Sequence, residues 1–117
     1  PMLRTRYGRI INISSVAAIA GNRGQVNYAA AKAALHGATK ALAQEVASRG
    51  VTVNVVAPGI IDSPMVEGLF DAETVARMVP MKRMGTSQEV AALVAFLASK
   101  DAGYITGQII SINGGMI

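Results

Sequence analysis

The sequence predicts an α/β protein with a parallel sheet, and two observations carry this prediction. Residues 9–13 (RIINI) and 51–57 (VTVNVVA) are short β-branched runs that end in polar or turn residues, as buried strands do. Between them, residues 27–49 are rich in alanine, leucine, lysine and glutamine, which favour helix. Strands that alternate with helices indicate parallel βαβ units with right-handed crossovers. The 117 residues are expected to form a single domain.

Composition excludes several classes of protein. With 51% hydrophobic and 15% charged residues the chain is not disordered, and without cysteine it has no disulfide scaffold and no thiolate metal site. Every apolar run is too short to span a bilayer, so we expect a protein of the reducing cytoplasm with no membrane contact. The net charge of +4 is spread along the chain, and the few aromatic residues offer no platform for stacking bases. Nucleic-acid binding is therefore not expected.

The first predicted elements are a strand, a helix and a strand. The first strand runs into Ser14 and Ser15, which open a loop that contains several glycines. Gly50 stands where the cap of the helix over 27–49 belongs, and Pro58 ends the second strand. An apolar stripe with helical spacing is expected along the helix, at Ala31, Leu35, Ala38, Leu42 and Val46.

The second half of the chain is less regular. Glycines and prolines interrupt residues 60–85, in which 71–79 is expected to form one short helix. We interpret this stretch as a mobile segment over a site. Thr86 and Glu89 form a capping box that opens an amphipathic helix, and residues 108–112 form the last strand.

Polar or turn residues follow each predicted strand, at 12–15, 58–63 and 113–115. The carboxyl ends of parallel strands lie at one edge of the sheet, and α/β proteins bind their ligands in the crevice outside that edge. The sequence therefore predicts a ligand site where these three clusters meet.

Tyr28 and Lys32 give the sharpest chemical signal. They stand four residues apart at the start of the long helix, and so they share one face within a single turn. A lysine cation this close favours the phenolate form of a tyrosine, which makes the tyrosine a usable proton donor or acceptor. Ser15, delivered by the loop after the first strand, is placed to polarise a substrate oxygen.

Each of these signals also has a simpler explanation. A tyrosine four residues before a lysine is more often an exposed side chain near a solvated cation, and Ser14 and Ser15 can serve as an ordinary helix cap or turn. Pro58 and Gly59 can be a strand terminator and nothing more. His36 has no acidic or histidine partner at metal or triad spacing. We assign it to the helix surface or a subunit contact, and we expect no metal site.

Three stretches taken together resemble one family. The run NISSVAAIAGNRGQVNYAAAK, followed by VTVNVVAPGIIDSPM and YITGQIISINGG, is similar to the C-terminal half of a short-chain dehydrogenase/reductase. Within that family it is especially similar to the 3-oxoacyl-[acyl-carrier-protein] reductases, and the resemblance covers essentially the whole chain. It implies the C-terminal half of a doubly wound, Rossmann-like parallel sheet. Residues 1–117 would then be one partial domain, with the N-terminal half absent from this chain.

The resemblance implies a role for each matching residue. Tyr28 matches the general acid that protonates a carbonyl oxygen as a nicotinamide hydride reaches its carbon. Lys32 matches the lysine that promotes ionisation of the tyrosine and binds the nicotinamide ribose, and Ser15 matches the serine that holds the carbonyl oxygen. Further cofactor contacts are implied near two strand ends, at Asn12, Ser14, Pro58, Gly59, Ile61 and Ser63.

The implied activity is NADPH-dependent reduction of a 3-oxoacyl thioester on acyl carrier protein to the 3-hydroxyacyl form, in fatty-acid or polyketide synthesis. The family's glycine-rich turn, which seats the cofactor pyrophosphate, is not among these residues, and the chain alone is therefore expected to be inactive. The residues that choose between NAD and NADP are also absent. Two alternatives stay open: a reductase of another small alcohol or ketone, and a catalytically silent assembly fragment.

Two kinds of partner are expected. An acidic carrier protein would dock on Arg6, just before the first strand, and on Arg49, at the end of the long helix, which we expect to flank one entrance. Small residues that would let a second helix approach closely lie along one flank of the long helix, at Ala30, Ala33, Gly37 and Ala41. Since the resembled family assembles through this helix, we expect a homotetramer.

Overall fold

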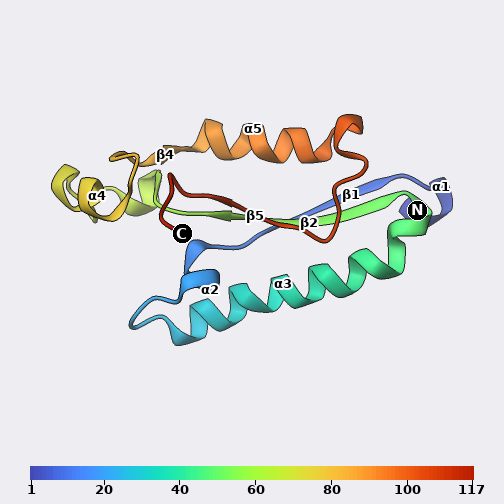
Figure 1. The fold of residues 1–117 in the computed structure, drawn as a ribbon, viewed down its shortest axis with the longest axis horizontal. Coiled ribbons are helices and arrows are strands. Elements are labelled where there is room, and N and C mark those ends of the chain that lie inside the picture. Colours follow the sequence, from blue (N-terminus) through green and yellow to red (C-terminus); the bar gives the residue numbers. More distant parts are fainter.

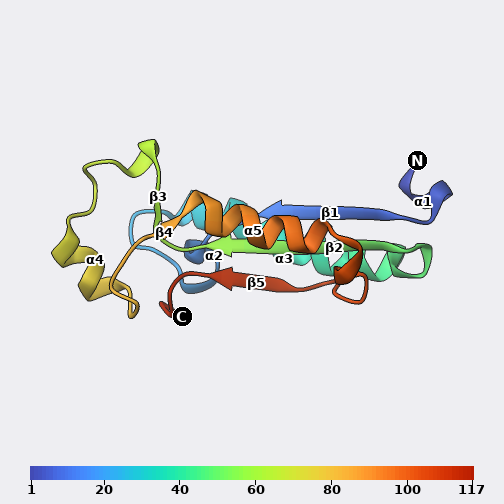
Figure 2. The ribbon, with the colours of Figure 1, turned by 90° about the horizontal axis from the view of Figure 1, so that it is seen from above.

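The computed structural model describes all residues from 1 to 117, and a three-stranded parallel sheet lies at its centre (Figures 1 and 2). The strands are arranged in the order β1–β2–β5, with β1 at Gly8–Ile13, β2 at Val51–Pro58 and β5 at Ile109–Ile112. This arrangement confirms the predicted α/β class, because each outer strand pairs in parallel with the central β2.

Helices cover both faces of the sheet. In Figure 1, α3 runs below the strands with α2 packed beside its first half, and α5 runs above them. The helices are α1 (Met2–Thr5), α2 (Val16–Ala20), α3 (Val26–Val46), α4 (Ala72–Met78) and α5 (Ser87–Ala98), with short 3-10 turns η1 (Ala47–Arg49), η2 (Pro64–Val66) and η3 (Lys100–Ala102). The order strand, helix, strand predicted for the first half is confirmed.

The carboxyl ends of the three strands open toward the same end of the molecule. Ile13 at the end of β1 lies beside Val56, and Ile112 at the end of β5 lies beside Pro58. The start of α3, together with α2 and α4, also lies at this end, on the left of Figure 1. Side chains that follow different strands are therefore brought to one edge of the sheet.

The strand β2 forms the core of the chain, because residues 51–57 are all buried, as expected for a central strand covered on both faces. Val51 and Val53 pack against Ala43 and Val46 of α3. The polar Asn54 is also buried, and both polar atoms of its amide are bonded: Nδ2 donates to the carbonyl oxygen of Ile105 at 2.9 Å, and Oδ1 accepts from the Gln108 N–H at 3.0 Å. This side chain ties β2 to the loop that leads into β5.

The loop expected after β1 is partly helical. Ser15 caps the five-residue helix α2, which ends at Gly21, in a stretch for which the sequence predicts only a loop. The apolar stretch is too short for a helical period to be read from it, whereas the serine and the glycine at its two ends supply the cap and the stop.

The long helix is confirmed, but the predicted phase of its apolar stripe is wrong at two positions. Ala31 and Ala38 are exposed, whereas Thr39, Ala43 and Val46 are the buried residues of α3. Alanine occurs on every side of this helix and has little burial preference of its own. The face that packs on β2 is therefore set by neighbours that the spacing of alanines does not reveal.

Residues 59–86 make an excursion beyond the sheet. It leaves through β3 (Ile61–Asp62) and returns through β4 (Gly85–Thr86), and these two short strands pair in parallel. The predicted short helix is present as α4. The predicted capping box is also confirmed: Thr86 accepts from the Glu89 N–H at 3.1 Å, and the Glu89 carboxylate accepts from the Thr86 N–H at 2.8 Å.

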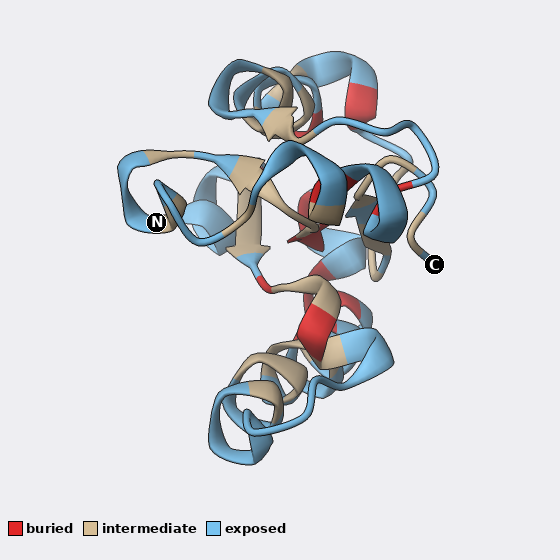
Figure 3. Cartoon of the chain, turned by 90° about the vertical axis from the view of Figure 1, so that its left-hand side faces the viewer, coloured by how far each residue is buried: buried red, intermediate tan, exposed pale blue.

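Much of the chain is exposed, as Figure 3 shows by the blue and tan that surround a small buried centre. Only 17 of 117 residues are buried, and large apolar side chains such as Val26, Met65 and Tyr104 lie on the surface. Exposed apolar area of this extent indicates surfaces that pack against further protein. None of the helices has the length and apolar character needed to cross a membrane.

Candidate active site

Ser15 is delivered to the carboxyl end of β1 in extended backbone conformation and caps α2. Its Oγ accepts a hydrogen bond from the Ala17 N–H at 3.2 Å. The simpler explanation, a helix cap, is thus correct for this serine. The cap does not prevent this hydroxyl from binding a ligand, because an oxygen that accepts from a backbone N–H still has its own proton to donate. The hydroxyl is held in place by the cap and can donate to a ligand oxygen.

Tyr28 and Lys32 share one face at the start of α3, as their spacing predicts. The Lys32 Nζ lies 5.9 Å from the centroid of the Tyr28 ring and donates to the carbonyl oxygen of Ile13 at 3.2 Å. Tyr28 is 44% exposed, so its hydroxyl is accessible to a ligand. Residues 24–28 line an open hollow of about 400 Å³ at this end of the helix. A phenol, a cation and a hydroxyl are thus carried by α3 and by the adjoining end of β1.

Asn12 and Ser14 use their side chains inside the chain. Asn12 Nδ2 donates to Thr39 Oγ1 at 2.9 Å, and the buried Ser14 hydroxyl lies 2.6 Å from His36 Nε2 and 3.4 Å from the Lys32 carbonyl oxygen. Both side chains therefore make contacts at the junction of β1 with α3, and the expectation that Asn12 and Ser14 contact a cofactor stays a prediction. They support the site from beneath.

His36 also differs from its assignment to the helix surface or a subunit contact. It is half-buried against the end of β1 through its hydrogen bond to Ser14. Burial, helped by the nearby Lys40 cation, lowers the pKa of His36 below its ordinary value. The imidazole is therefore neutral at physiological pH.

The second cluster follows β2 and is shaped by close packing. The Gly59 N–H donates to the Ile112 carbonyl oxygen at 2.9 Å, and a Cβ at Gly59 would come within 2.7 Å of the Asn113 Cβ. Gly59 is thus more than a strand terminator, since only glycine fits this approach of two strand ends. Ser63 precedes η2 without capping it through its side chain, which leaves its hydroxyl available.

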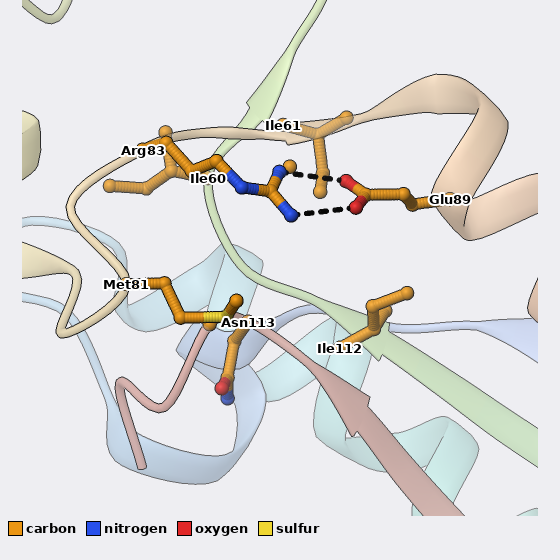
Figure 4. A pocket seen from close by; sticks show the side chains of 9 residues that line it. Ile60, Ile61, Met81, Arg83, Glu89, Ile112 and Asn113 are labelled. Atoms are coloured by element: carbon orange, nitrogen blue, oxygen red, sulfur yellow. Dashed lines mark hydrogen bonds and ion pairs between the residues drawn. The ribbon is translucent and has the colours of Figure 1, made fainter.

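Beside this cluster lies a cavity of about 180 Å³, seen from close by in Figure 4. Arg83 and Glu89 face each other across its rim with two hydrogen bonds, at 2.7 and 3.0 Å. These bonds and those from Thr86 lower the pKa of Glu89 from 4.5 to about 2. The remaining lining residues come from both strand ends and from the excursion, namely Ile60, Ile61, Met81, Gly85, Ile112, Asn113 and Gly114.

Arg6 and Arg49 lie close together, at the end of the molecule opposite Tyr28. Arg6 reaches η1 and donates to the Ser48 carbonyl oxygen at 3.4 Å, so both arginines stand at the amino end of β1. Tyr28 is in the first turns of α3 and Arg49 lies beyond its last turn, about 30 Å away along a helix of this length. The expectation that Arg6 and Arg49 flank one entrance for a carrier protein stays a prediction, and that entrance lies at the opposite end of α3 from Tyr28 of the same chain.

Sequence reasoning missed two side chains at this end of the molecule. His36 joins Ser14 across 22 positions of sequence, and Arg83 joins Glu89 from a loop to a helix. Neither pair has a fixed spacing that a motif would reveal. For His36 the one available signal is its position eight residues after Tyr28, on the same face as Lys32.

Comparison with known proteins places these features in a family. The family model described as enoyl-(acyl carrier protein) reductase matches residues 1–117. Nodulation protein G of Rhizobium sp. (strain N33) is 56% identical over 118 residues, which cover 99% of this chain and 48% of the relative. The 3-oxoacyl-[acyl-carrier-protein] reductases FabG of Salmonella typhimurium and Vibrio cholerae are 56% and 55% identical over 117 residues, covering 98% of this chain and 48% of each relative.

The chain thus spans about half the length of the curated relatives it matches. The matched range includes Ser15, Tyr28 and Lys32 and all three strands of the central sheet. As the resemblance of its motifs predicts, the chain belongs to the short-chain dehydrogenase/reductase family.

Proposed function

We propose that residues 1–117 supply the catalytic half of an NADPH-dependent 3-oxoacyl-[acyl-carrier-protein] reductase. One observation carries the proposal: an accessible Tyr28 and the Lys32 cation lie at the start of α3, and Ser15 stands at the adjoining end of β1. The names of the FabG relatives support the choice of a 3-oxoacyl substrate on a carrier protein.

The proposed roles follow from the chemistry of each group. Ser15 donates its free proton to the carbonyl oxygen of the substrate and orients the carbonyl group. Tyr28 transfers its phenolic proton to the same oxygen as negative charge develops there. The Lys32 cation stabilises the phenolate that Tyr28 becomes. A bound NADPH supplies the hydride that completes the reduction.

The side chains present suit the nicotinamide half of that cofactor. Lys32 uses one N–H on Ile13 and keeps two for the hydroxyls of a ribose. We propose that Tyr28, Pro58, Gly59, Ile61 and Ser63 complete the contacts, with the backbone after β2 facing the carboxamide. A pyrophosphate needs a glycine-rich turn at the start of a helix, and we assign that task to sequence outside these 117 residues.

Apolar surface near the site supports an acyl substrate. Met65, Leu69 and Met81 of the excursion are 89%, 69% and 62% exposed, although each is a large apolar side chain. A hydrocarbon chain that packs on these side chains would remove their apolar area from water, which favours binding by a free energy of about 25 cal/mol per Å². The excursion is therefore the proposed acyl-binding segment.

Assembly and docking complete the proposal. The small residues of α3 favour a homotetramer formed through that helix, and Arg6 with Arg49 forms a basic site for an acidic carrier protein. Because this basic site lies far from Tyr28 of its own chain, we propose that the docked carrier serves a neighbouring subunit. The lack of cysteine fits a reducing cytoplasmic compartment.

The test is a substrate comparison on the intact protein. NADPH oxidation is measured with a 3-oxoacyl thioester and with a 2-enoyl thioester, each on acyl carrier protein, and with a small soluble ketone. Fast oxidation with the 3-oxoacyl carrier substrate supports the proposal. A clear preference for the enoyl thioester, turnover of the soluble ketone alone, or no turnover of any substrate would refute it.

A further inference from the structure

The junction of β1 with α3 contains a polar contact that the proposed mechanism does not use. Ser14 is 4% exposed and is bonded on two sides: its N–H donates to the Val56 carbonyl oxygen at 2.8 Å, and its Oγ lies 2.6 Å from His36 Nε2. Ser14 directly precedes Ser15. His36 follows Lys32 by one helical turn.

The two side chains satisfy one another in a buried setting. A neutral imidazole with its proton on Nε2 donates to Ser14 Oγ, and the serine hydroxyl then donates to the Lys32 carbonyl oxygen at 3.4 Å. Neither β1 nor α2 brings a charged side chain near this contact, because Arg9 stands at the far end of β1. The cations on α3 itself are Lys32 and Lys40. Burial favours the neutral form of His36.

We propose that His36 is a positioning residue that acts through Ser14 to hold Ser15 in register with Tyr28 and Lys32. The inference rests on the proposed reductase function. Ser15 is carried by β1 and α2, whereas Tyr28 and Lys32 are carried by α3. The Ser14–His36 bond joins the end of β1 to α3, at the residue next to Ser15 and one helical turn after Lys32.

Loss of the Ser14–His36 contact is expected to change the alignment of Ser15 and to leave the packing of the core intact. Without it, α3 is still held on β2 by Ala43 and Val46, so the chain remains folded. The end of β1 keeps its bonds to α3 at Asn12 and Ile13 but loses the contact next to Ser15, which leaves the serine hydroxyl less well aligned. Misalignment of a group that acts in the transition state lowers kcat and spares the binding of substrate and cofactor.

The test compares Ser14→Ala, His36→Leu, the double variant and His36→Gln in the intact protein. Each single loss is expected to lower kcat about three- to tenfold, the equivalent of one hydrogen bond, with KM for both substrates within about twofold. The double variant should be no slower than the slower single variant. His36→Gln, which offers Ser14 a new amide partner, should recover most of kcat. Glu45→Gln, at an exposed position further along α3, is the matched control with unchanged kcat.

Hydrogen exchange gives a readout that does not depend on turnover. Exchange of the Ala17 amide, which donates to Ser15 Oγ, should be faster in Ser14→Ala and His36→Leu and unchanged in Glu45→Gln. If kcat and this exchange rate stay at wild-type values in Ser14→Ala, the positioning role is refuted. Losses in the two single variants that multiply in the double variant would refute it as well. If Tyr28→Phe keeps full turnover, the proposed function itself fails, which is a different result.

Discussion

Lys32 and Ile13 connect the long helix to the first strand: the Lys32 Nζ donates to the Ile13 carbonyl oxygen at 3.2 Å. The bond fixes the lysine at the end of β1, with its charge 5.9 Å from the centre of the Tyr28 ring. The cation is therefore held near the phenol by the main chain of another element, with no carboxylate to neutralise it.

Replacing Tyr28 with phenylalanine removes the proton donor and keeps the ring. In the intact protein, turnover should fall by about 10²- to 10⁴-fold, the usual contribution of a general acid, while cofactor affinity changes little. Steady-state kinetics and a cofactor titration measure the two effects. Tyr104→Phe is the matched control, because Tyr104 is fully exposed and lies outside the site. A Tyr28→Phe enzyme with more than half of its activity would contradict the assignment.

Ser15 caps α2 and is the proposed donor to the carbonyl oxygen, and measurements of stability and of turnover separate these two roles. Ser15→Ala removes both the cap of α2 and the proposed donor to the carbonyl oxygen, whereas Ser15→Thr keeps both groups. We expect kcat to fall by about 10²-fold in Ser15→Ala, as for loss of one oxyanion donor, and the melting temperature to fall by a few degrees through loss of the cap. If Ser15→Ala lowers the melting temperature and leaves kcat unchanged, Ser15 serves only as the cap of α2 and the proposed donor role is wrong.

The pair formed by Arg83 and Glu89 predicts a dependence of stability on pH. The folded-state pKa of Glu89 is lowered from 4.5 to about 2, so its stabilising contribution is present in full above about pH 4.5. The contribution is lost as the pH falls from there through about 2. Urea unfolding of wild type and Glu89→Gln at several pH values measures the contribution of Glu89 to the free energy of unfolding. The difference in unfolding free energy should be constant at neutral pH and should shrink below pH 4.5; a constant difference down to pH 2 would exclude the mechanism.

Gly37 provides a test of assembly that does not disturb the fold. Nothing lies within 4 Å of a Cβ built at this position, and glutamine favours helix more than glycine by about 0.5–1 kcal/mol. Gly37→Gln should therefore keep the monomer stable and block the close approach of a second α3. Light scattering should show a tetramer for the wild type and a smaller species for the variant. Glu45→Gln, also exposed on α3, is the control. A monomeric wild type would reject the proposed assembly.

Charge reversal at Arg6 and Arg49 tests the proposed carrier-docking site. The double substitution Arg6→Glu with Arg49→Glu should slow reduction of the carrier-bound substrate, mainly through slower association, and should leave a soluble ketone unaffected. Because the docked carrier is proposed to serve a neighbouring subunit, the same change should have no effect in the Gly37→Gln background. Equal losses on both substrates would point to a folding defect, since Arg6 also bonds to η1.

The sequence predicts those elements whose signals are local. A β-branched run between Gly50 and Pro58 gives β2, and the spacing of Thr86 and Glu89 gives the start of α5. Tyr28 and Lys32 meet because they share one helical turn. In each case the interacting groups lie within a few residues of each other, and no tertiary contact is needed to identify them.

Other features depend on how the elements pack. The rotation of α3 about its axis decides that Thr39 is buried and Ala38 exposed, and the alanine-rich sequence leaves this rotation open. The same rotation turns His36 toward Ser14. The length of α3 separates Arg49 from Tyr28, and the sequence alone does not show at which end of the molecule Arg6 and Arg49 come together.

The pairing of β3 with β4 makes the excursion a closed loop. Ile61 and Asp62 lie beside Gly85 and Thr86, so the chain leaves the body of the fold and re-enters it at adjacent points. We expect an insertion or deletion in the excursion's largely exposed first part, residues 64–70, to be absorbed within the loop without a shift in the register of β2 or in the cap of α5. This geometry allows the excursion to diverge in length and sequence while Ser15, Tyr28 and Lys32 stay where they are.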